Sequence, residues 1–163
     1  MKCLIFSDSH GRCDYIKKAL RLHPDAEVVF FLGDGVGDLE EIKAQYPQKA
    51  FLAVYGNCDY YRILGSAPLD AVGEIQLLGK RIVYTHGHLF DVKFSLVALS
   101  QLAKARCADI VLFGHTHKAC EQYIAEPHPH YLFNPGSIGQ QNHSYGIMIL
   151  KDGWPLFSVG EIE

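Results

Sequence analysis

The feature that most constrains the fold of this chain is a set of short apolar runs rich in Val, Ile and Phe. The runs occupy residues 3–6, 28–32, 50–55, 81–85 and 110–113. Their length and lack of polar alternation are typical of strands that are buried on both faces of a sheet. Stretches with apolar residues three or four positions apart, which predict helices, lie between the runs at 12–22, 38–46 and 92–106. This alternation predicts an α/β fold.

The pattern changes after residue 118. Strand-like segments joined by Pro, Gly and Asn turns follow at 121–125, 130–134, 145–150 and 156–160, which predicts an antiparallel portion of the sheet. Earlier in the chain, Gly79 separates two strand-like segments and predicts a hairpin. A chain of 163 residues is long enough for one sound hydrophobic core. We therefore expect a single domain over residues 1–163.

Charge and cysteine content exclude several classes of protein. The formal net charge of -3 has the wrong sign for a surface that binds extended nucleic acid. The five cysteines form no C-x-x-C pair, which argues against a disulfide framework or a zinc ribbon and favours a reducing compartment. We find no signal sequence and no apolar segment long enough to span a membrane. We expect a cytoplasmic protein without a membrane partner, and the sequence leaves open whether it forms a homo-oligomer.

Each apolar run is followed by glycines and by polar side chains that can bind metal ions. Because ligands of α/β sheets bind beyond the carboxyl ends of the strands, these loops are expected to converge. The candidate donors are Asp8, His10, Asp34, Asn57, His86, His115 and His117. The sequence therefore predicts a metal centre at this edge of the sheet.

The types of donor restrict the metal. Nitrogen and oxygen ligands without thiolate favour Mn, Fe, Zn, Co or Ni over Ca or Mg alone, and we expect manganese first. Seven donors are too many for one tetrahedral ion, but they fit two divalent ions that share a carboxylate. Two dications would outweigh the charges of Asp8 and Asp34 and attract a phosphate. Such a pair can hold a bridging hydroxide and clamp phosphoryl oxygens for in-line attack.

The order of these motifs resembles that of the calcineurin-like metallophosphoesterases. The motifs are Asp8-x-His10, Gly33-Asp34, Gly56-Asn57, His86-Gly-His88 and Gly114-His115-Thr-His117. The short chain and the Asn134-Pro-Gly-Ser137 segment make it most similar to the small, single-domain YfcE-type phosphodiesterase branch. The resemblance implies a four-layer αββα sandwich with two mixed β-sheets.

The resemblance also implies which residues would hold each ion. Asp34 would bridge the two. The first ion would be held by Asp8, His10, Asp34 and His117, and the second by Asp34, Asn57, His86 and His115. The expected activity is hydrolysis of a small phosphate ester by the metal-held hydroxide.

One departure from the family pattern bears on the substrate. Many relatives that cleave monoesters have His directly after the Gly-Asn pair, where this chain has Cys58. A thiol with a reference pKa of about 8.5 replaces an imidazole poorly beside two cations, so we predict that diesterase activity exceeds monoesterase activity. We expect Asp34, Asn57, Cys58 and His88 to act in catalysis. Whether His88 supplies a proton or contacts the phosphate is left open.

Several polar residues outside these motifs have other interpretations. Asp38, with Glu41 three residues later, predicts a helix N-cap outside the site. Asp59 is either a turn residue or a carboxylate that orients a histidine. The histidines without a matching motif are interpreted as surface residues: His23, His128, His130 and His143.

The alternative function is a protein-binding scaffold, because one subunit of the retromer coat shares this fold with a modified site. The complete donor set favours the enzyme.

Overall fold

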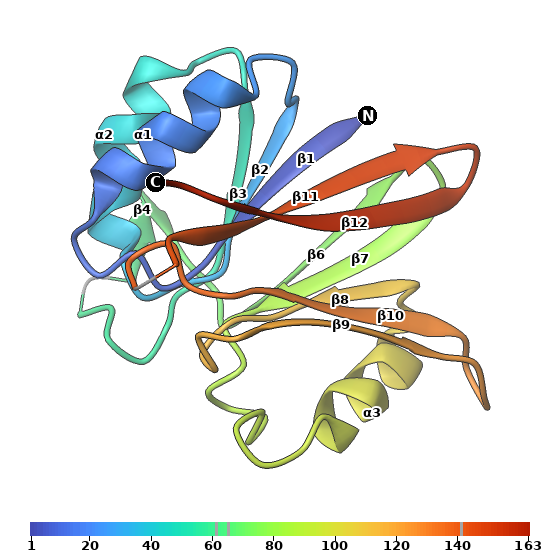
Figure 1. Ribbon diagram of the computed structural model, residues 1–163. Helices are drawn as coiled ribbons and strands as arrows, with labels where there is room; N and C mark the ends of the chain where they lie inside the picture. The colour runs from blue at the N-terminus through green and yellow to red at the C-terminus, as the bar shows by residue number, and fades with distance from the viewer. Residues whose placement is uncertain (61, 65, 141) are drawn as a thin grey trace.

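The computed structural model describes residues 1–60, 62–64, 66–140 and 142–163. Two five-stranded sheets pack face to face (Figure 1). In sheet order, the first consists of β12 (Trp154–Glu161), β11 (Ser144–Lys151), β1 (Lys2–Phe6), β2 (Val28–Phe31) and β3 (Ala50–Ala53). The second consists of β6 (Val72–Leu77), β7 (Lys80–Thr85), β8 (Ile110–Leu112), β10 (His130–Pro135) and β9 (Ala119–Ile124). A small separate ladder joins β4 (Ile63–Leu64) to β5 (Ala67–Pro68).

Helices cover the outer faces of both sheets. Figure 1 shows α1 (Cys13–Leu22) and α2 (Val36–Gln45) against the first sheet and α3 (Val97–Arg106) against the second. This is the expected four-layer αββα sandwich. None of the helices that the structure describes is both long and apolar enough to cross a membrane.

Both sheets are mixed. β1, β2 and β3 are parallel neighbours, whereas β11 pairs antiparallel with β1. In the second sheet β7, β8 and β10 are parallel, and β6 and β9 are antiparallel edge strands. The predicted hairpin is confirmed, with Leu77 opposite Lys80. The parallel strands bring the loops that carry the polar motifs to the same end of the sandwich.

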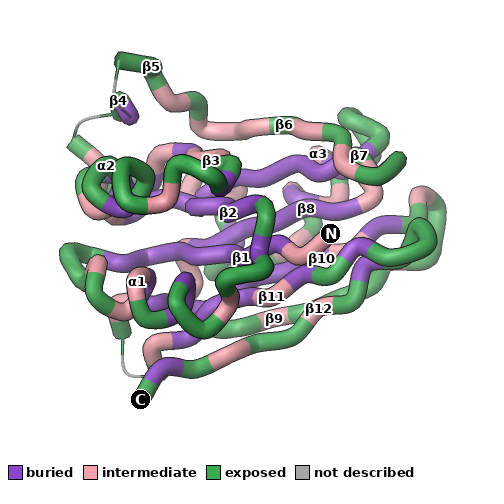
Figure 2. Tube along the Cα trace, turned by 90° about the horizontal axis from the view of Figure 1, so that it is seen from above, coloured by how far each residue is buried: buried purple, intermediate pink, exposed green. Residues whose placement is uncertain are grey.

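The apolar runs lack polar alternation because their strands face two cores. On β1, Leu4 and Phe6 pack with α1 and α2, while Cys3 and Ile5 face the second sheet. On β10, Leu132 packs toward α3 and Phe133 packs between the sheets. Figure 2 shows buried residues concentrated along these central strands. Apolar residues on both faces of a strand stabilise all four layers at once.

Two helix starts differ from the sequence-based expectation. The last helix begins at Val97 rather than at residue 92, because Asp91 adopts a φ of 50° and the Ser95 hydroxyl accepts the N–H of Val97. Helix α2 begins at Val36, so the interpretation of Asp38 as its N-cap is wrong. The Asp38 carboxylate instead accepts hydrogen bonds from Ser9 Oγ (2.6 Å) and the N–H of Gly11 (3.0 Å). It therefore fixes the loop after β1.

Candidate metal centre

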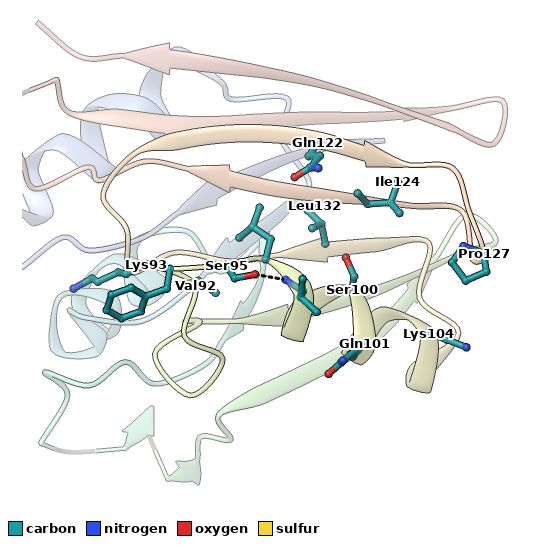
Figure 3. A pocket seen from close by; sticks show the side chains of 13 residues that line it. Val92, Lys93, Ser95, Ser100, Gln101, Lys104, Gln122, Ile124, Pro127 and Leu132 are labelled. Carbon is teal, nitrogen blue, oxygen red and sulfur yellow. Dashed lines mark hydrogen bonds between the residues drawn. The ribbon is translucent and has the colours of Figure 1, made fainter.

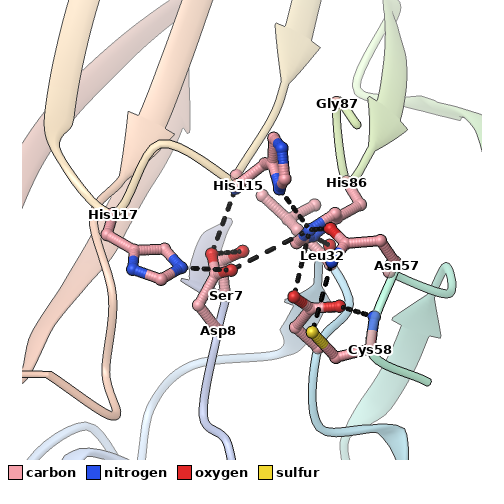
Figure 4. Close-up of polar contacts among 12 residues, drawn as sticks. Ser7, Asp8, Leu32, Asn57, Cys58, His86, Gly87, His115 and His117 are labelled. Carbon is pink, nitrogen blue, oxygen red and sulfur yellow. Dashed lines mark hydrogen bonds and ion pairs between the residues drawn. The ribbon is translucent and has the colours of Figure 1, made fainter. Parts of the chain in front are cut away.

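The structure brings the predicted donors together just beyond the strands that precede them. Figure 4 labels Asp8, Asn57, His86, His115 and His117 of this set. One group consists of Asp8, His10 and His117, and a second of Asp34, His86 and His115. Within each group the potential ligand atoms all lie within 4.8 Å of one another. Asn57 joins the second group, because its Oδ1 lies 3.1 Å from His86 Nε2. All seven donors therefore contribute to one cluster.

The backbone at these donors is unusual. Five of them have a positive φ, between 46° and 68°: Asp8, His10, Asp34, His115 and His117. This left-handed conformation costs about 1–2 kcal/mol per residue for side chains other than glycine. Strained backbone of this kind gathers at ligand-binding and catalytic sites, where the surrounding fold maintains it. The cluster thus has the backbone signature of a functional site.

Gly33 allows the loops after β2 and β3 to approach each other. It has a φ of 94°, and a Cβ atom at this position would overlap the backbone of Gly56. A side chain here would force Asp34 and Asn57 apart. The glycine beside the aspartate is therefore required by the close approach of two backbones.

Among the residues that the structure describes, Asp8 has a buried side-chain oxygen without a hydrogen bond. Its side chain is fully buried, and Oδ2 accepts hydrogen bonds from Ser7 Oγ (2.5 Å) and the N–H of His115 (3.1 Å). Within the described part of the chain, Oδ1 makes no hydrogen bond, although His117 Nε2 lies 3.1 Å away. A buried carboxylate oxygen without a hydrogen bond is costly. A metal cation at this oxygen would remove the cost.

His86 also directs a lone pair into the cluster. Its Nδ1 lies 2.7 Å from the carbonyl oxygen of Leu32, which only accepts, so Nδ1 carries a proton. In the neutral ring Nε2 is then an acceptor, and it lies 3.1 Å from Asn57 Oδ1, 3.2 Å from His115 Nδ1 and 3.4 Å from Asp34 Oδ2. Acceptor atoms this close repel one another unless a proton or a metal ion lies between them. The Nδ1–carbonyl contact is the arrangement that orients metal-binding histidines.

The surroundings of the cluster shift the pKa values of its histidines in opposite directions. Burial disfavours the charge of Asp34. When His86 is protonated, its Nε2 donates to Asp34, and this contact together with the N–H of Cys58 outweighs burial and lowers the pKa of Asp34. Burial opposes and Asp34 favours the charged form of His86, and its pKa is raised. Burial and the nearby charge of His86 lower the pKa of His115 to about 4. His115 therefore presents a neutral ring to a metal ion at neutral pH.

Asp59 closes a turn, as one of the two sequence interpretations expected, and its N–H donates to the carbonyl oxygen of Gly56 (3.4 Å). Its carboxylate also joins two loops, which neither interpretation expected. Its carboxylate accepts hydrogen bonds from the N–H groups of Asp34 (2.8 Å), Gly35 (2.8 Å), Val36 (2.9 Å) and Gly56 (2.7 Å). It binds backbone rather than a histidine ring, and it caps the start of α2. Together with Asp38, Asp59 holds the loops that carry the donors. The only sequence signal for it is its position directly after the Gly56-Asn57-Cys58 motif.

Cys58 and His88 border the cluster. The N–H of Cys58 donates to Asp34 Oδ1 (2.7 Å), and its thiol accepts from Asn57 Nδ2 (3.2 Å). The His88 ring centroid is 5.3 Å from that of His86, and its buried Nδ1 has no hydrogen-bond partner among the described residues. Burial lowers the pKa of His88. A cavity of about 640 Å³ opens beside Cys58 and Tyr60, and Cys58 rather than any of the seven donors lines it.

Comparisons with known proteins identify the family of the chain. A family model described as the calcineurin-like phosphoesterase superfamily domain matches residues 1–153. The chain is 31% identical over 157 residues to the probable metallophosphoesterase YsnB of Bacillus subtilis, covering 93% of this chain and 86% of YsnB. It is 32% identical to the phosphodiesterase YfcE of Escherichia coli over an alignment of 170 positions, which covers 91% of this chain and 87% of YfcE.

Two further likenesses concern the fold and the alternative function. The crystal structure of a predicted phosphoesterase from Streptococcus pneumoniae superposes with a TM-score of 0.79 at 26% identity, covering 98% of this chain and 88% of that one. The vacuolar protein sorting-associated protein 29 of Schizosaccharomyces pombe is 42% identical over 77 residues, which is 47% of this chain and 38% of that protein.

Proposed function

The chain belongs to the calcineurin-like phosphoesterase superfamily, and from that premise we propose that it is a phosphodiesterase that uses two divalent metal ions to hydrolyse a small phosphate diester. One observation supports this most strongly. Asp8 Oδ1, which has no hydrogen bond within the described residues, lies 3.9 Å from the lone-pair nitrogen of His86. Both atoms are fully buried, and both are acceptors when His86 is neutral. Cations satisfy such a pair.

The donor set fits two ions that share Asp34. The first would be held by Asp8, His10, Asp34 and His117, and the second by Asp34, Asn57, His86 and His115. Manganese is the preferred ion, with Ni, Zn, Fe and Co as alternatives, because the donors are nitrogen and oxygen atoms. When bound, these ions supply Lewis acidity toward phosphoryl oxygens and acidify water.

The chain's own residues orient the donors and receive the substrate. Asp59 and Asp38 hold the loops of Asp34 and Asp8 through backbone hydrogen bonds. His88 is expected to be neutral at neutral pH, since burial lowers its pKa, and so to contact a phosphoryl oxygen as an N–H donor. The cavity beside Cys58 would accept one ester group of the diester. Cys58 replaces the histidine of monoesterases and would not protonate a poor leaving group at neutral pH.

The test is a metal reconstitution assay. The protein is stripped with a chelator, reloaded separately with Mn, Ni, Zn or Mg, and assayed with bis-p-nitrophenyl phosphate and p-nitrophenyl phosphate. We expect hydrolysis only after reloading and a higher kcat/KM for the diester. His115→Ala should abolish turnover, whereas His128→Ala, whose ring contacts the Ala108 carbonyl away from the cluster, should not. A faster monoester reaction would contradict the diesterase assignment.

The partial likeness to the vacuolar sorting protein keeps a second candidate, a protein-binding scaffold. A scaffold would show no hydrolysis of any ester with any of the four metals. It would also keep its protein partner when His115 is replaced. The buried Asp8 Oδ1, which has no hydrogen bond among the described residues, favours the enzyme, because a scaffold does not need it.

A further inference from the structure

A second cluster of reactive side chains lies away from the metal centre, between α3 and β10. His130 was expected at the surface because prolines precede it, but its exposure is only 3%. Its Nε2 lies 3.1 Å from Ser100 Oγ, and its Nδ1 lies 2.6 Å from the carbonyl oxygen of His128. The serine, the imidazole and the carbonyl therefore form a continuous chain of hydrogen bonds.

The direction of these hydrogen bonds follows from the carbonyl. A carbonyl oxygen only accepts, so Nδ1 of His130 carries the proton and donates to His128. In the neutral ring Nε2 is then the acceptor, and the hydroxyl of Ser100 must donate to it. His130 can therefore act as a base toward the Ser100 proton, and the His128 carbonyl orients the imidazole from its other side. Activated serine nucleophiles have the same order of groups.

Ser100 is accessible from a groove. It is half-buried and lines a groove of about 610 Å³ between α3 and the second sheet (Figure 3). Leu96, Ile124 and Leu132 provide apolar walls. Lys104 also lines the groove one helical turn after Ser100 and therefore lies on the same face of α3. A volume of this size is in the range of small-molecule sites.

We propose that Ser100 is a nucleophile, activated by His130, that cleaves carboxylic esters with an apolar acyl group. Ser100 Oγ attacks the acyl carbon while its proton moves to His130 Nε2. The carbon–oxygen bond to the alcohol then breaks, and the alcohol leaves with that proton. Water cleaves the acyl-serine by the same route and restores the hydroxyl. The apolar walls would receive the acyl chain, and the Lys104 ammonium would stabilise the negative charge on the carbonyl oxygen. No step needs the metal centre.

The test uses a fluorophosphonate probe, which forms a bond to activated serines and releases fluoride. Chelator-treated full-length protein is labelled and the modified peptide is identified by mass spectrometry. We expect labelling at Ser100 and its loss in Ser100→Ala. Ser95→Ala is the matched control, because the Ser95 hydroxyl lines the same groove and accepts the N–H of Val97 instead of contacting an imidazole.

Replacement of His130 tests whether the imidazole activates Ser100 or only packs against it. His130→Gln keeps the serine and should slow labelling at least tenfold, with thermal unfolding used to confirm that the variant is folded. Hydrolysis of p-nitrophenyl butyrate should persist in Asp34→Ala and disappear in Ser100→Ala, whatever the outcome for phosphate diesters. Three results would each overturn the proposal: an unlabelled wild-type protein, unchanged labelling in Ser100→Ala, or unchanged labelling in folded His130→Gln. In those cases the Ser100–His130 contact only joins α3 to β10.

Discussion

Asp59 accepts a hydrogen bond of 2.8 Å from the backbone N–H of Asp34, the carboxylate that we propose is shared by both ions. The same oxygen of Asp59 accepts the N–H of Gly56 at 2.7 Å. One carboxylate thereby joins the loops that follow β2 and β3. The position of the shared ligand depends on a residue that does not itself face the ions.

Replacement of Asp59 by Asn should destabilise the protein and weaken metal binding together. The amide offers one acceptor oxygen and places an N–H₂ group against backbone donors. Hydrogen bonds to charged groups contribute about 1.5–3 kcal/mol each, so we expect a loss of about 2–4 kcal/mol in the free energy of unfolding. Urea denaturation measures this loss. Asp152→Asn, an exposed turn residue, is the control and should change little.

The histidines of the metal-free protein should titrate far apart. The carboxylate of Asp8 raises the pKa of His117, whereas burial and His86 lower that of His115 to about 4. His117 therefore contributes stability that is complete below about 6.5, the pKa of an unfolded histidine, and is lost as the pH rises through its folded pKa. For His115 the stability is present above about 6.5 and is lost as the pH falls toward 4.

Nuclear magnetic resonance of the imidazole nitrogens against pH checks this order. The resonances of His115 should stay those of a neutral ring down to about pH 4, while those of His117 should change above pH 6.5. Coincident titrations of the two rings would show that the cluster is open to solvent.

Cys58→His should shift activity toward monoesters. An imidazolium is an effective proton donor near neutral pH, whereas burial and the Asp34 carboxylate raise the pKa of the Cys58 thiol in the metal-free protein and make it a weaker acid. We expect the ratio of kcat/KM for p-nitrophenyl phosphate to that for the diester to rise at least tenfold. Cys107→Ser, also exposed, should leave the ratio unchanged. An unchanged ratio in Cys58→His would show that residue 58 does not determine the preference between diesters and monoesters.

His88→Ala should lower turnover without loss of metal. Its ring borders the cluster but is absent from the proposed ligands, so metal content should stay at the wild-type level while kcat falls by about 10²-fold, as for a lost contact to a developing charge. Parallel elemental analysis and steady-state kinetics separate the two effects. A fall in metal content would instead make His88 part of the binding shell.

The sequence was sufficient to predict most of this arrangement. The apolar runs identify strands buried on both faces, and each donor follows the end of such a run, as Asp8 follows β1 and His86 follows β7. The contacts of Asp59 with the N–H of Asp34 and of Asp38 with the N–H of Gly11 could not be predicted, because they join residues more than 20 positions apart in the chain. The burial of His130 was missed for a similar reason, since it depends on the packing of α3 rather than on the neighbouring prolines.

The central claim is that seven donors hold two divalent ions around Asp34. The most direct measurement is the number of ions bound per chain, by elemental analysis of protein that has been loaded with manganese and then desalted, with Asp34→Ala analysed beside it. We predict two ions in the wild-type protein and less than one in Asp34→Ala, because the variant removes a ligand from both ions. A wild-type protein that retains no manganese, or a variant that retains as much as the wild type, would contradict this account.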